Sequence, residues 1–567
     1  MTSHAYPRYG CRRLDACLAG EPLRHPVVIV GAGPCGLVLA IDLAQHGVPT
    51  IVLDEEDTVS TGSRAICFAK RTLEVLDRIG VGEQCVCKGA VWNVGRTFFR
   101  DDEVYHFDLQ PRHDQHRPGM VNLQQYYLEE YLIERANAVP GLDLRFGHRL
   151  VGLRPENDGV SLDIETPEGP YTMSADWVVA ADGCRSTIRH ALGLNTQSDI
   201  VEAHFLIADV TMQADFPSER WFWFNAPFHD GQSVLLHHQP DNVWRIDFQL
   251  GWDADPEVEC RPENVTRRIH AMLGKDHPFE LEWVSVYTFQ SRRMEKFRHG
   301  RVLFVGDAAH QVSPFGARGA NSGIQDAWNL SWKLKLVLDR NAPERLLDTY
   351  SDERVFAADE NIRVTTRTAD FMTPASKASV TFRNAVLALA RKYPFARALV
   401  NSGRLSVPVY LTDSALNTED SGDFASDMGP GAPCDDVAVR TASGDAWLLD
   451  QLGRGFNVLT YVDGQLDDVD VATLRELADG SIPVDVVAIS QTSAASGRGV
   501  KVLHDHAGQF RARYDARPGS TWLVRPDQYL AGRWREVDAV AVRAALSRAT
   551  CNVLSARRPV AATATAS

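Results

Sequence analysis

The 567-residue sequence lacks the features that mark partners of nucleic acids and membranes. Acidic residues outnumber basic ones by 74 to 59, for a formal net charge of −15, whereas nucleic acids and anionic membranes attract a basic excess. No apolar run approaches the roughly 18 residues of a membrane span, and Met1 to Arg24 lacks the continuous apolar core of a signal peptide. We therefore expect a cytoplasmic chain with a small-molecule partner, no nucleic-acid partner and no membrane partner.

Clustered cysteines are also lacking. The ten cysteines are scattered, and the closest pair, Cys85 and Cys87, has no second cysteine or histidine cluster near it. Zinc sites and disulfide frameworks need such clusters at set spacings. We expect no metal site, no disulfide framework, and buried free thiols instead.

The length exceeds one hydrophobic core, so about two to four domains are expected. Residues 26–54 read as strand, turn, helix and strand, which opens a parallel α/β domain, whereas the short alternating aromatic runs of 206–251 indicate an antiparallel sheet. Helical patterns cover 322–338 and 343–365. After a loop rich in Asp, Ser, Gly and Pro at 417–433, strand and helix patterns alternate again and predict a smaller α/β domain.

Glycine is concentrated where the chain leaves an apolar strand. In VVIVGAGPCGLVLAIDLAQHGVPTIVLDEE, Gly31, Gly33 and Gly36 follow the apolar run directly. The GxGxxG spacing gives a tight turn, lets a pyrophosphate approach the backbone, and lets the helix pack on the strand. The next strand ends at Asp54, about twenty residues on, where a carboxylate bonds ribose hydroxyls. The segment predicts dinucleotide binding.

Two later segments separate the possible dinucleotides. ADWVVAADGCRSTIRHALGL contains Asp182-Gly183, and GRVLFVGDAAHQVSPFGARGANSGIQDA contains Gly306-Asp307. In this order and spacing the three motifs resemble the flavoprotein aromatic hydroxylases, the single-component FAD monooxygenases typified by para-hydroxybenzoate and 3-(3-hydroxyphenyl)propionate hydroxylases. The resemblance spans roughly residues 26–365, and LVRPDQYLAGRW near the end is similar to members with a thioredoxin-like third domain.

The resemblance implies an α/β fold with a Rossmann-like FAD-binding domain, an inserted antiparallel-sheet substrate domain and a thioredoxin-like C-terminal domain. The implied boundaries are an N-terminal extension (1–25), the FAD-binding domain (26–92, 119–196 and 292–372), the substrate domain (93–118 and 197–291), a helical linker (373–424), the C-terminal domain (425–556) and a disordered tail (557–567). The C-terminal domain has no CxxC pair, so we expect packing or oligomerisation there, such as homodimer formation, rather than redox activity.

The resemblance also implies cofactor contacts by position. The pyrophosphate would lie at Gly31, Gly33 and Gly36, and the ribose at Asp54. A helix beginning near Gly319 would aim unpaired N–H groups at the flavin's pyrimidine edge. The residues expected around the flavin and its ribityl chain are Arg64, Gln125 (in preference to Gln124), Asp182, Gly306, Asp307, Pro314, Gly319 and Asn321.

The activity implied is NAD(P)H-dependent hydroxylation of a phenolic or related aromatic substrate. Hydride would pass from NADH or NADPH to FAD, O2 would add at the flavin C4a position, and the distal oxygen would pass to an electron-rich ring. No second GxGxxG follows a strand, so NADH and NADPH remain open. The alternatives are an FAD enzyme that epoxidises, inserts oxygen into a ring or dehydrogenates, and a flavin-binding scaffold with vestigial catalysis.

Substrate residues are less determined by the sequence. His237 or His238 could relay a phenol proton, although either could be structural. Aromatic side chains could line a pocket or form sheet core, and arginines could bind a carboxylate or lie in solvent. The aromatic candidates are Trp221, Trp223, Phe224 and Phe248, the arginine candidates are Arg245, Arg292 and Arg293, and the predicted catalytic set is His237, Arg245 and Pro314. His310 is expected to position its loop.

Overall fold

The computed structural model describes residues 4–11, 24–110, 114–251, 253–374, 376–400, 405–420, 423–464, 468–478, 482–492 and 500–552. The chain forms two units, one of Met1–Ser331 with Ser351–Val409 and one of Trp332–Tyr350 with Tyr410–Ser567. The predicted tail at 557–567 lies outside the described residues, as do residues 1–3 and 12–23 of the predicted extension at 1–25. The other predicted domain boundaries remain predictions.

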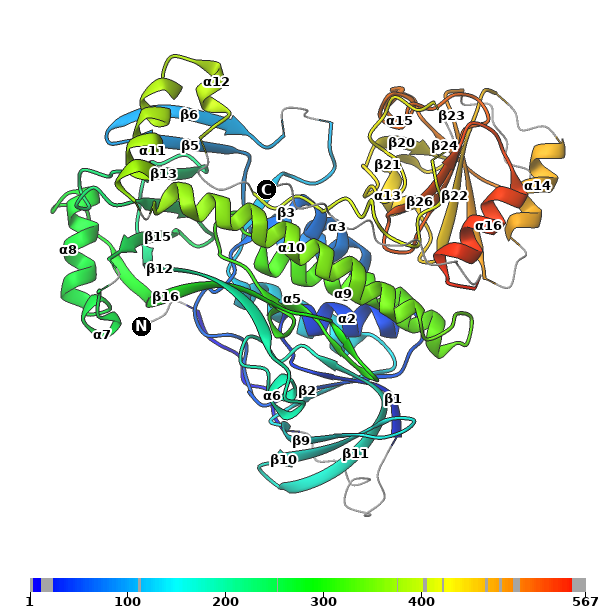
Figure 1. The fold of residues 1–567 in the computed structure, drawn as a ribbon, viewed down its shortest axis with the longest axis horizontal. Coiled ribbons are helices and arrows are strands. Elements are labelled where there is room, and N and C mark those ends of the chain that lie inside the picture. The colour runs from blue at the N-terminus through cyan, green and yellow to red at the C-terminus, as the bar shows by residue number, and fades with distance from the viewer. Residues whose placement is uncertain are drawn as a thin grey trace, which may run out of the picture. The chain divides into compact units, whose positions relative to one another are not determined.

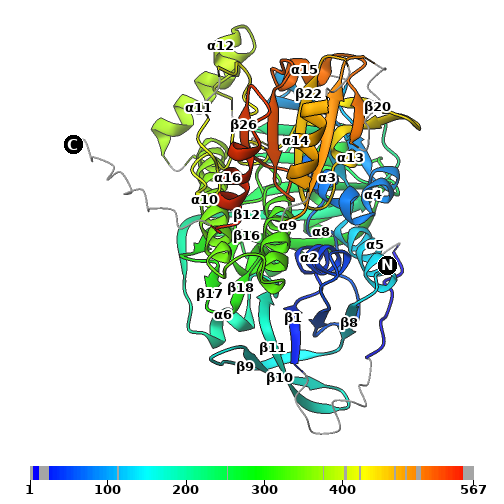
Figure 2. The same cartoon turned by 90° about the vertical axis from the view of Figure 1, so that its right-hand side faces the viewer.

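A largely parallel sheet carries the glycine turn of the first unit. Its strand order is β17-β18-β11-β1-β2-β8, with β10 and β9 attached beside β11. The strands are β1 (Arg24–Val30), β2 (Thr50–Asp54), β8 (Leu142–Phe146), β9 (Arg149–Pro155), β10 (Val160–Thr166), β11 (Gly169–Ala180), β17 (Arg298–His299) and β18 (Val302–Phe304). Because β1 is central, its apolar run is buried, and α2 (Pro34–Gln45) follows it directly (Figure 2). The predicted strand, turn, helix and strand are thus confirmed.

The second sheet of this unit is mainly antiparallel, with order β19-β16-β12-β15-β14-β13-β5-β6, and only β13 and β5 pair in parallel. Its strands are β5 (Val94–Phe99), β6 (Asp102–Asp108), β12 (Thr196–Thr211), β13 (Arg220–Phe224), β14 (Val234–His238), β15 (Val243–Leu250), β16 (Glu280–Met294) and β19 (His310–Gln311). One face of this sheet, which we call the outer face, packs on α8 (Pro262–Leu273) through Val265 and Ile269. We call the opposite face the inner face. Its residues Phe205 and Phe222 pack in one cluster with Phe315.

Smaller elements complete the first unit. A three-stranded sheet joins β3 (Cys67–Ala69), β7 (Met120–Asn122) and β4 (Ala90–Trp92). The helices are α3 (Lys70–Ile79), α4 (Gly82–Lys88), α5 (Gln125–Ala138), α6 (Thr187–Ala191), α7 (Pro256–Glu259), α11 (Lys377–Ala390), α12 (Pro394–Arg397) and the 3-10 turn η1 (Gly306–Ala308). None of the helices in the described ranges is long and apolar enough to cross a membrane.

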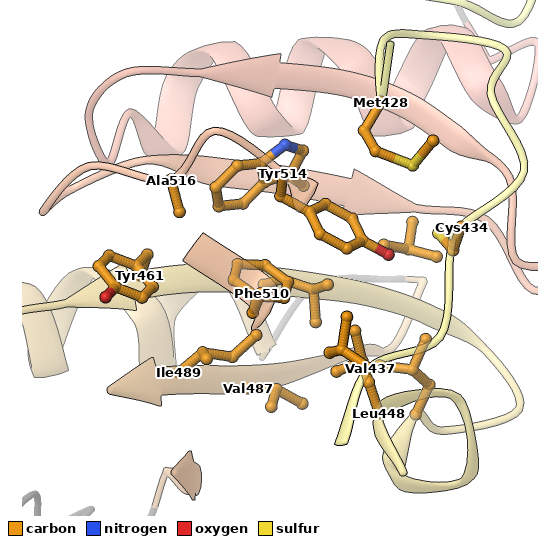
Figure 3. Packing of buried hydrophobic residues seen from close by; sticks show 14 of the residues in the cluster. Met428, Cys434, Val437, Leu448, Tyr461, Val487, Ile489, Phe510, Tyr514 and Ala516 are labelled. Atoms are coloured by element: carbon orange, nitrogen blue, oxygen red, sulfur yellow. The ribbon is translucent and has the colours of Figure 1, made fainter. Parts of the chain in front are cut away.

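The second unit has a mixed seven-stranded sheet of order β21-β20-β24-β23-β22-β25-β26. Its elements are β20 (Ala438–Thr441), β21 (Gly444–Trp447), α13 (Leu448–Gln451), β22 (Phe456–Val462), α14 (Asp468–Ala478), β23 (Val484–Ser490), β24 (Lys501–His504), α15 (Gln509–Arg513), β25 (Thr521–Val524), β26 (Leu530–Trp534) and α16 (Ala539–Ala549). In its core, Phe510 stacks on Tyr514 at 4.3 Å beside the buried thiol of Cys434 (Figure 3). The α/β character is confirmed, and the thioredoxin-like description remains a prediction.

Two long helices, α9 (Gly319–Leu338) and α10 (Leu346–Met372), follow one another along the chain (Figure 1). A buried ion pair joins them. The Asp326 carboxylate on α9 accepts from Arg354 Nε on α10 at 2.6 Å, bonds His310 Nε2 at 2.6 Å and accepts from Gly306 N at 3.1 Å. Burial would raise the pKa of Asp326, but the charges of His310 and Arg354 hold it below its usual value. One carboxylate therefore ties the loop at 306–310 to both helices.

We expect Arg354→Met to lower the free energy of unfolding by about 3–5 kcal/mol, because it leaves the buried Asp326 carboxylate without its arginine partner. Urea denaturation of the purified protein measures the change. Arg363→Met is the matched control, since the Arg363–Glu360 pair is exposed on the same helix and such pairs contribute little. Equal small effects of the two substitutions would contradict the importance of the buried pair.

Candidate functional site

The glycine turn after β1 is shaped to admit a ligand at its backbone. Gly31 has φ +110°, and a Cβ on Gly36 would lie 2.0 Å from the Gly31 carbonyl oxygen, so both positions need glycine for packing. At Gly33, in contrast, no heavy atom of the described residues lies within 4 Å of a Cβ position. Gly33 also precedes α2 without a side-chain cap, which leaves the first N–H groups of the helix for an anionic ligand.

Asp54 lies at the end of β2, beside this turn. Its Oδ2 accepts from Ala32 N at 2.6 Å and its Oδ1 from Glu56 N at 2.9 Å. Burial raises the pKa of Asp54, although these two backbone bonds oppose the shift. The carboxylate therefore braces the glycine turn, and its ribose contact remains a prediction.

The Gly306-Asp307 loop meets the glycine turn from the other side. A Cβ on Gly323 of α9 would lie 2.5 Å from Cys35 Sγ and 3.0 Å from Gly306 Cα, so glycine alone allows α2, η1 and α9 to converge here. Asp307 is exposed, and no hydrogen bond from the described part of the chain reaches its carboxylate. Desolvation by the surrounding protein raises the pKa of the Asp307 carboxyl. The positive charges of His310, Arg292 and Arg64 oppose that increase. A hydroxyl-bearing ligand would supply the missing donor.

The chain turns sharply after Pro314. Ala317 N donates to the Pro314 carbonyl at 2.9 Å, and two successive residues, Gly316 and Ala317, have φ values of +104° and +54°. A left-handed alanine is strained. The turn exposes Pro314 and buries Phe315, which meets Phe205 of the inner face edge to face at 5.2 Å between ring centroids.

Asn321 uses its side chain within the protein. Its Oδ1 accepts from Ala69 N at 2.8 Å and Thr72 Oγ1 at 2.6 Å, and its Nδ2 donates to the Cys67 carbonyl at 2.8 Å. The amide thus ties the start of α9 to β3. Any cofactor contact of Asn321 must come from its backbone, as it must at Gly319, where only Val312 lies near a Cβ position, at 3.9 Å.

The loop that carries Arg64 is held on several sides. Gln125 accepts from Ala65 N at 3.0 Å, and Gly62 N donates to the Tyr6 hydroxyl at 3.1 Å. Ser63 bonds Asp209 of the substrate sheet. The Arg64 side chain itself is exposed, so this network positions the residue while leaving its guanidinium accessible.

Arg245, predicted as a substrate ligand, is part of that network. Its Nε donates to Asp209 Oδ1 at 3.0 Å and its Nη1 to the Arg64 carbonyl at 3.1 Å. The other two arginine candidates also have protein partners, since Arg292 donates to Gln311 and to the Cys184 carbonyl at 3.2 Å, and Arg293 pairs with Asp359 at 2.5 Å. In these positions the three guanidinium groups hold segments together.

Asp182-Gly183 is linked to the Gly306-Asp307 loop through α6. Asp182 Oδ2 accepts from Ile188 N at 3.1 Å at the start of α6, and burial raises its pKa. Arg189 of α6 donates to the Ala308 carbonyl of η1 at 2.9 Å. The two motifs are therefore in direct contact through Arg189. His310, which is bonded to Asp326, helps to position the same loop, as expected.

Alternation along the strands separates the aromatic candidates. Trp221, Trp223 and Phe248 pack in the outer-face cluster with α8, whereas Phe224 belongs to the inner-face cluster. Of the two interpretations given above, these clusters support sheet core. The four side chains cannot share one pocket, because residues one apart on a strand point to opposite faces. His238 likewise lies against Trp244, at 4.5 Å between ring centroids.

His237 points to the inner face and is buried. Its pKa is lowered well below the usual value by burial and by the charges of Arg220 and Arg245, so it is neutral near pH 7 and a weak base. Two neighbours, Arg220 and Asp247, were missed from the sequence. Their signal was a charged residue in an otherwise apolar strand, at the start of RWFWF and in the middle of VWRIDFQL. Only the register shows that the two share a face.

These residues fit a dinucleotide cofactor with a hydroxylated chain. The open position at Gly33 and the uncapped helix suit a diphosphate, and the exposed Asp307 and Arg64 suit the hydroxyls and oxygens that follow. Within the described ranges, no group of three or more His, Cys, Asp or Glu side chains could hold a metal ion.

Comparisons with known proteins agree with this geometry. A family model described as FAD binding domain matches residues 24–365, and one described as HcaD C-terminal domain matches residues 436–549. The 6-methylpretetramide 4-monooxygenase of Streptomyces rimosus is 32% identical over 541 residues, 89% of this chain and 90% of that protein. The 3-(3-hydroxy-phenyl)propionate/3-hydroxycinnamic acid hydroxylase of Escherichia coli O139:H28 is 27% identical over 511 residues, 89% and 91% of the two chains. The flavin-dependent monooxygenase PieE, solved with FAD and substrate, shares the fold with a TM-score of 0.79 at 23% identity, over 94% of this chain and 100% of that one.

We expect Gly33→Ala and Gly36→Ala to separate binding from folding. Gly33 has φ −73° and open space, so alanine there leaves the ligand-free protein stable but weakens dinucleotide affinity by about tenfold or more. Alanine at Gly36 meets backbone and destabilises the fold by about 1–3 kcal/mol. Thermal unfolding and flavin fluorescence titration measure the two effects, and a Gly33→Ala protein with normal flavin affinity would contradict the assignment.

Proposed function

The chain belongs to the flavoprotein aromatic hydroxylases, whose members are FAD-dependent monooxygenases, and on this basis we propose that it hydroxylates a phenolic or related aromatic substrate with electrons from NADH or NADPH. The observation that carries the proposal is the meeting of three open features. These are the open space beside Gly33, the exposed Asp307 carboxylate and the exposed Arg64 side chain.

The chain's own residues would hold and orient FAD. Gly33 and the start of α2 would bind the diphosphate through backbone N–H groups. Gly31 shapes the turn instead, because its own N–H already donates to the Leu53 carbonyl at 2.7 Å. Asp307 would accept from ribityl hydroxyls, and Arg64 would reach phosphate or ribityl oxygens. The first N–H groups of α9 would stabilise negative charge on the ring. The chemistry supplied by bound FAD is acceptance of hydride and activation of O2.

The inner face of the substrate sheet would exclude water from the reacting ring. Phe205, Phe222 and Phe315 pack in one apolar cluster beside the turn at Pro314. Such packing keeps solvent from diverting activated oxygen to hydrogen peroxide. An aromatic substrate would thus lie between the inner face and this turn.

Two finer parts of the proposal concern setting and assembly. A cytoplasmic location suits an enzyme that consumes NADH or NADPH. A homodimer formed through the C-terminal unit would account for a folded domain without a CxxC pair, and sedimentation of the purified protein would test it against a monomer.

We expect the purified protein to carry FAD and to oxidise NADH or NADPH faster when the right phenol is added. A screen of phenols and aryl acids, with products identified by mass spectrometry under ¹⁸O2, measures both rate and oxygen incorporation. Stimulated oxidation that yields only hydrogen peroxide across the screen would overturn the hydroxylase function.

We expect Asp307→Ala to weaken FAD retention by about tenfold or more, because it removes a charged hydrogen-bond acceptor. The FAD content after gel filtration and the dissociation constant of the apo-protein measure the loss. Asp163→Ala is the control, since Asp163 pairs with Arg154 across the β9–β10 hairpin rather than with the cofactor loop. An Asp307→Ala protein that retains full FAD would count against the role.

A further inference from the structure

A polar row crosses the inner face of the substrate sheet. Arg220 of β13 stands opposite His237 of β14, His237 opposite Arg245 of β15, and Arg245 opposite Asp209 of β12. Directly opposed residues of neighbouring strands share a face. Asp247, two residues after Arg245, points to the same face. Five ionisable side chains are thus gathered on one buried surface.

Of the two arginines in this row, only Arg245 has a direct counter-ion within the described residues. Arg245 is neutralised by Asp209 at 3.0 Å. Arg220 is 3% exposed, yet its guanidinium has no hydrogen bond or ion pair within the described part of the chain, and its one ring contact is with Phe222 at 5.6 Å. Burial lowers the pKa of Arg220 to about 10. A buried cation in this state is costly unless an anion joins it.

Asp247 is the neighbouring group able to take a proton. Its Oδ1 is buried without a hydrogen-bond partner. Burial raises its pKa to about 6, with Arg245 and Arg220 lowering it and Asp209 raising it. Of the other groups facing it, His237 is neutral, and burial raises the pKa of the Cys67 thiol of β3 to about 12. Asp247 is therefore ionised near pH 7, and its raised pKa favours acceptance of a proton.

The pair lies on the face that meets the turn at Pro314. Leu235 stands opposite Asp247 across the β14–β15 ladder and opposite Phe222 across the β13–β14 ladder. Leu235 and Phe222 both pack in the cluster that contains Phe315. A ring placed between the inner face and this turn would therefore have Asp247 and Arg220 beside it.

We propose that Asp247 and Arg220 together convert an acidic hydroxyl of the substrate, a phenol or an enol, into its bound anion. The O–H bond breaks, the proton passes to Asp247 Oδ1, and the oxygen keeps the electron pair and faces the Arg220 guanidinium. The net charge of the cluster is unchanged, because Asp247 becomes neutral as the anion forms. The inference rests on the proposed function and deepens it, since an ionised ring is more electron-rich and accepts oxygen more readily.

The test uses 4-nitrophenol, whose anion has its own visible absorbance, and 4-nitroanisole, its methyl ether, which cannot ionise. Both are titrated into the FAD-loaded protein between pH 5 and 8. We expect the bound nitrophenol to ionise at a pH about one unit or more below its solution value, which corresponds to tenfold. A wild-type protein that binds the ether as tightly as the phenol, or binds neither, overturns the proposal.

Arg220→Met should raise the apparent pKa of bound nitrophenol by about one unit or more and weaken its affinity about tenfold, with the ether unaffected. It should also raise the thermal midpoint of the ligand-free protein, whereas loss of a merely structural arginine lowers it. Arg220→Lys, which keeps the charge, should retain part of the pKa shift. Arg96→Met is the control, because Arg96 stands opposite Trp221 in the neighbouring strand and pairs with Glu219.

Asp247→Asn should release about one more proton per nitrophenol anion bound, measured by calorimetry in buffers of different ionisation enthalpy, because the internal acceptor is gone. Unchanged proton release, or an unchanged ligand pKa in Arg220→Met, overturns the pair. FAD content and oxygenated product are measured on the same preparations. A wild-type protein that hydroxylates while these variants behave normally refutes the pair alone, and a protein without FAD or product refutes the proposed function.

Discussion

The buried carboxylate of Asp326 is the constraint on which the rest of the site depends. It bonds Gly306 N, His310 and Arg354 at once, so the loop that begins at Gly306 cannot move without exposing or orphaning a charge. Since that loop leads directly into the turn at Pro314 and the start of α9, the positions of Asp307 and of the helix N-terminus follow from one ionic centre. Buried ion pairs often contribute little net stability, but here the pair determines geometry.

Close backbone approach is the second constraint, and it explains the crowding of glycines. Gly323 and Gly306 let α9 come against η1 beside Cys35, and Gly36 lets α2 come against Gly31. These glycines serve packing between segments. Gly33 differs, because the space beside it is open to a ligand. The same residue type thus has two separate physical roles within one motif, and only the surroundings of each position distinguish them.

Much of the cofactor side was predictable from sequence, since the βαβ unit and the order of the three motifs depend on local patterns. The supports of the Arg64 loop were not, because Tyr6, Gln125 and Asp209 reach it from segments far apart in the chain. The prediction of the substrate-site residues failed for another reason. RWFWF predicts a strand, but which of its alternate residues face the cofactor loop depends on register with β14 and β5. The sequence therefore led us to name Trp221 and Trp223, which lie on the outer face, and to omit Arg220, which lies on the inner face.

The contrast between Arg245 and Arg220 shows how neighbouring residues of one type can differ in purpose. Both are buried, and His237 stands between them on the same face. Arg245 has Asp209 as its counter-ion and holds the Arg64 loop to the sheet, so its charge is used in the folded protein. Among the described residues Arg220 has no such counter-ion, and Asp247 remains ionised nearby although its Oδ1 is buried without a hydrogen-bond partner. A fold selected for stability alone would join these two charges directly or replace both with apolar residues. The acidic hydroxyl of the proposed substrate would complete this arrangement, since its anion would face Arg220 while Asp247 holds the proton.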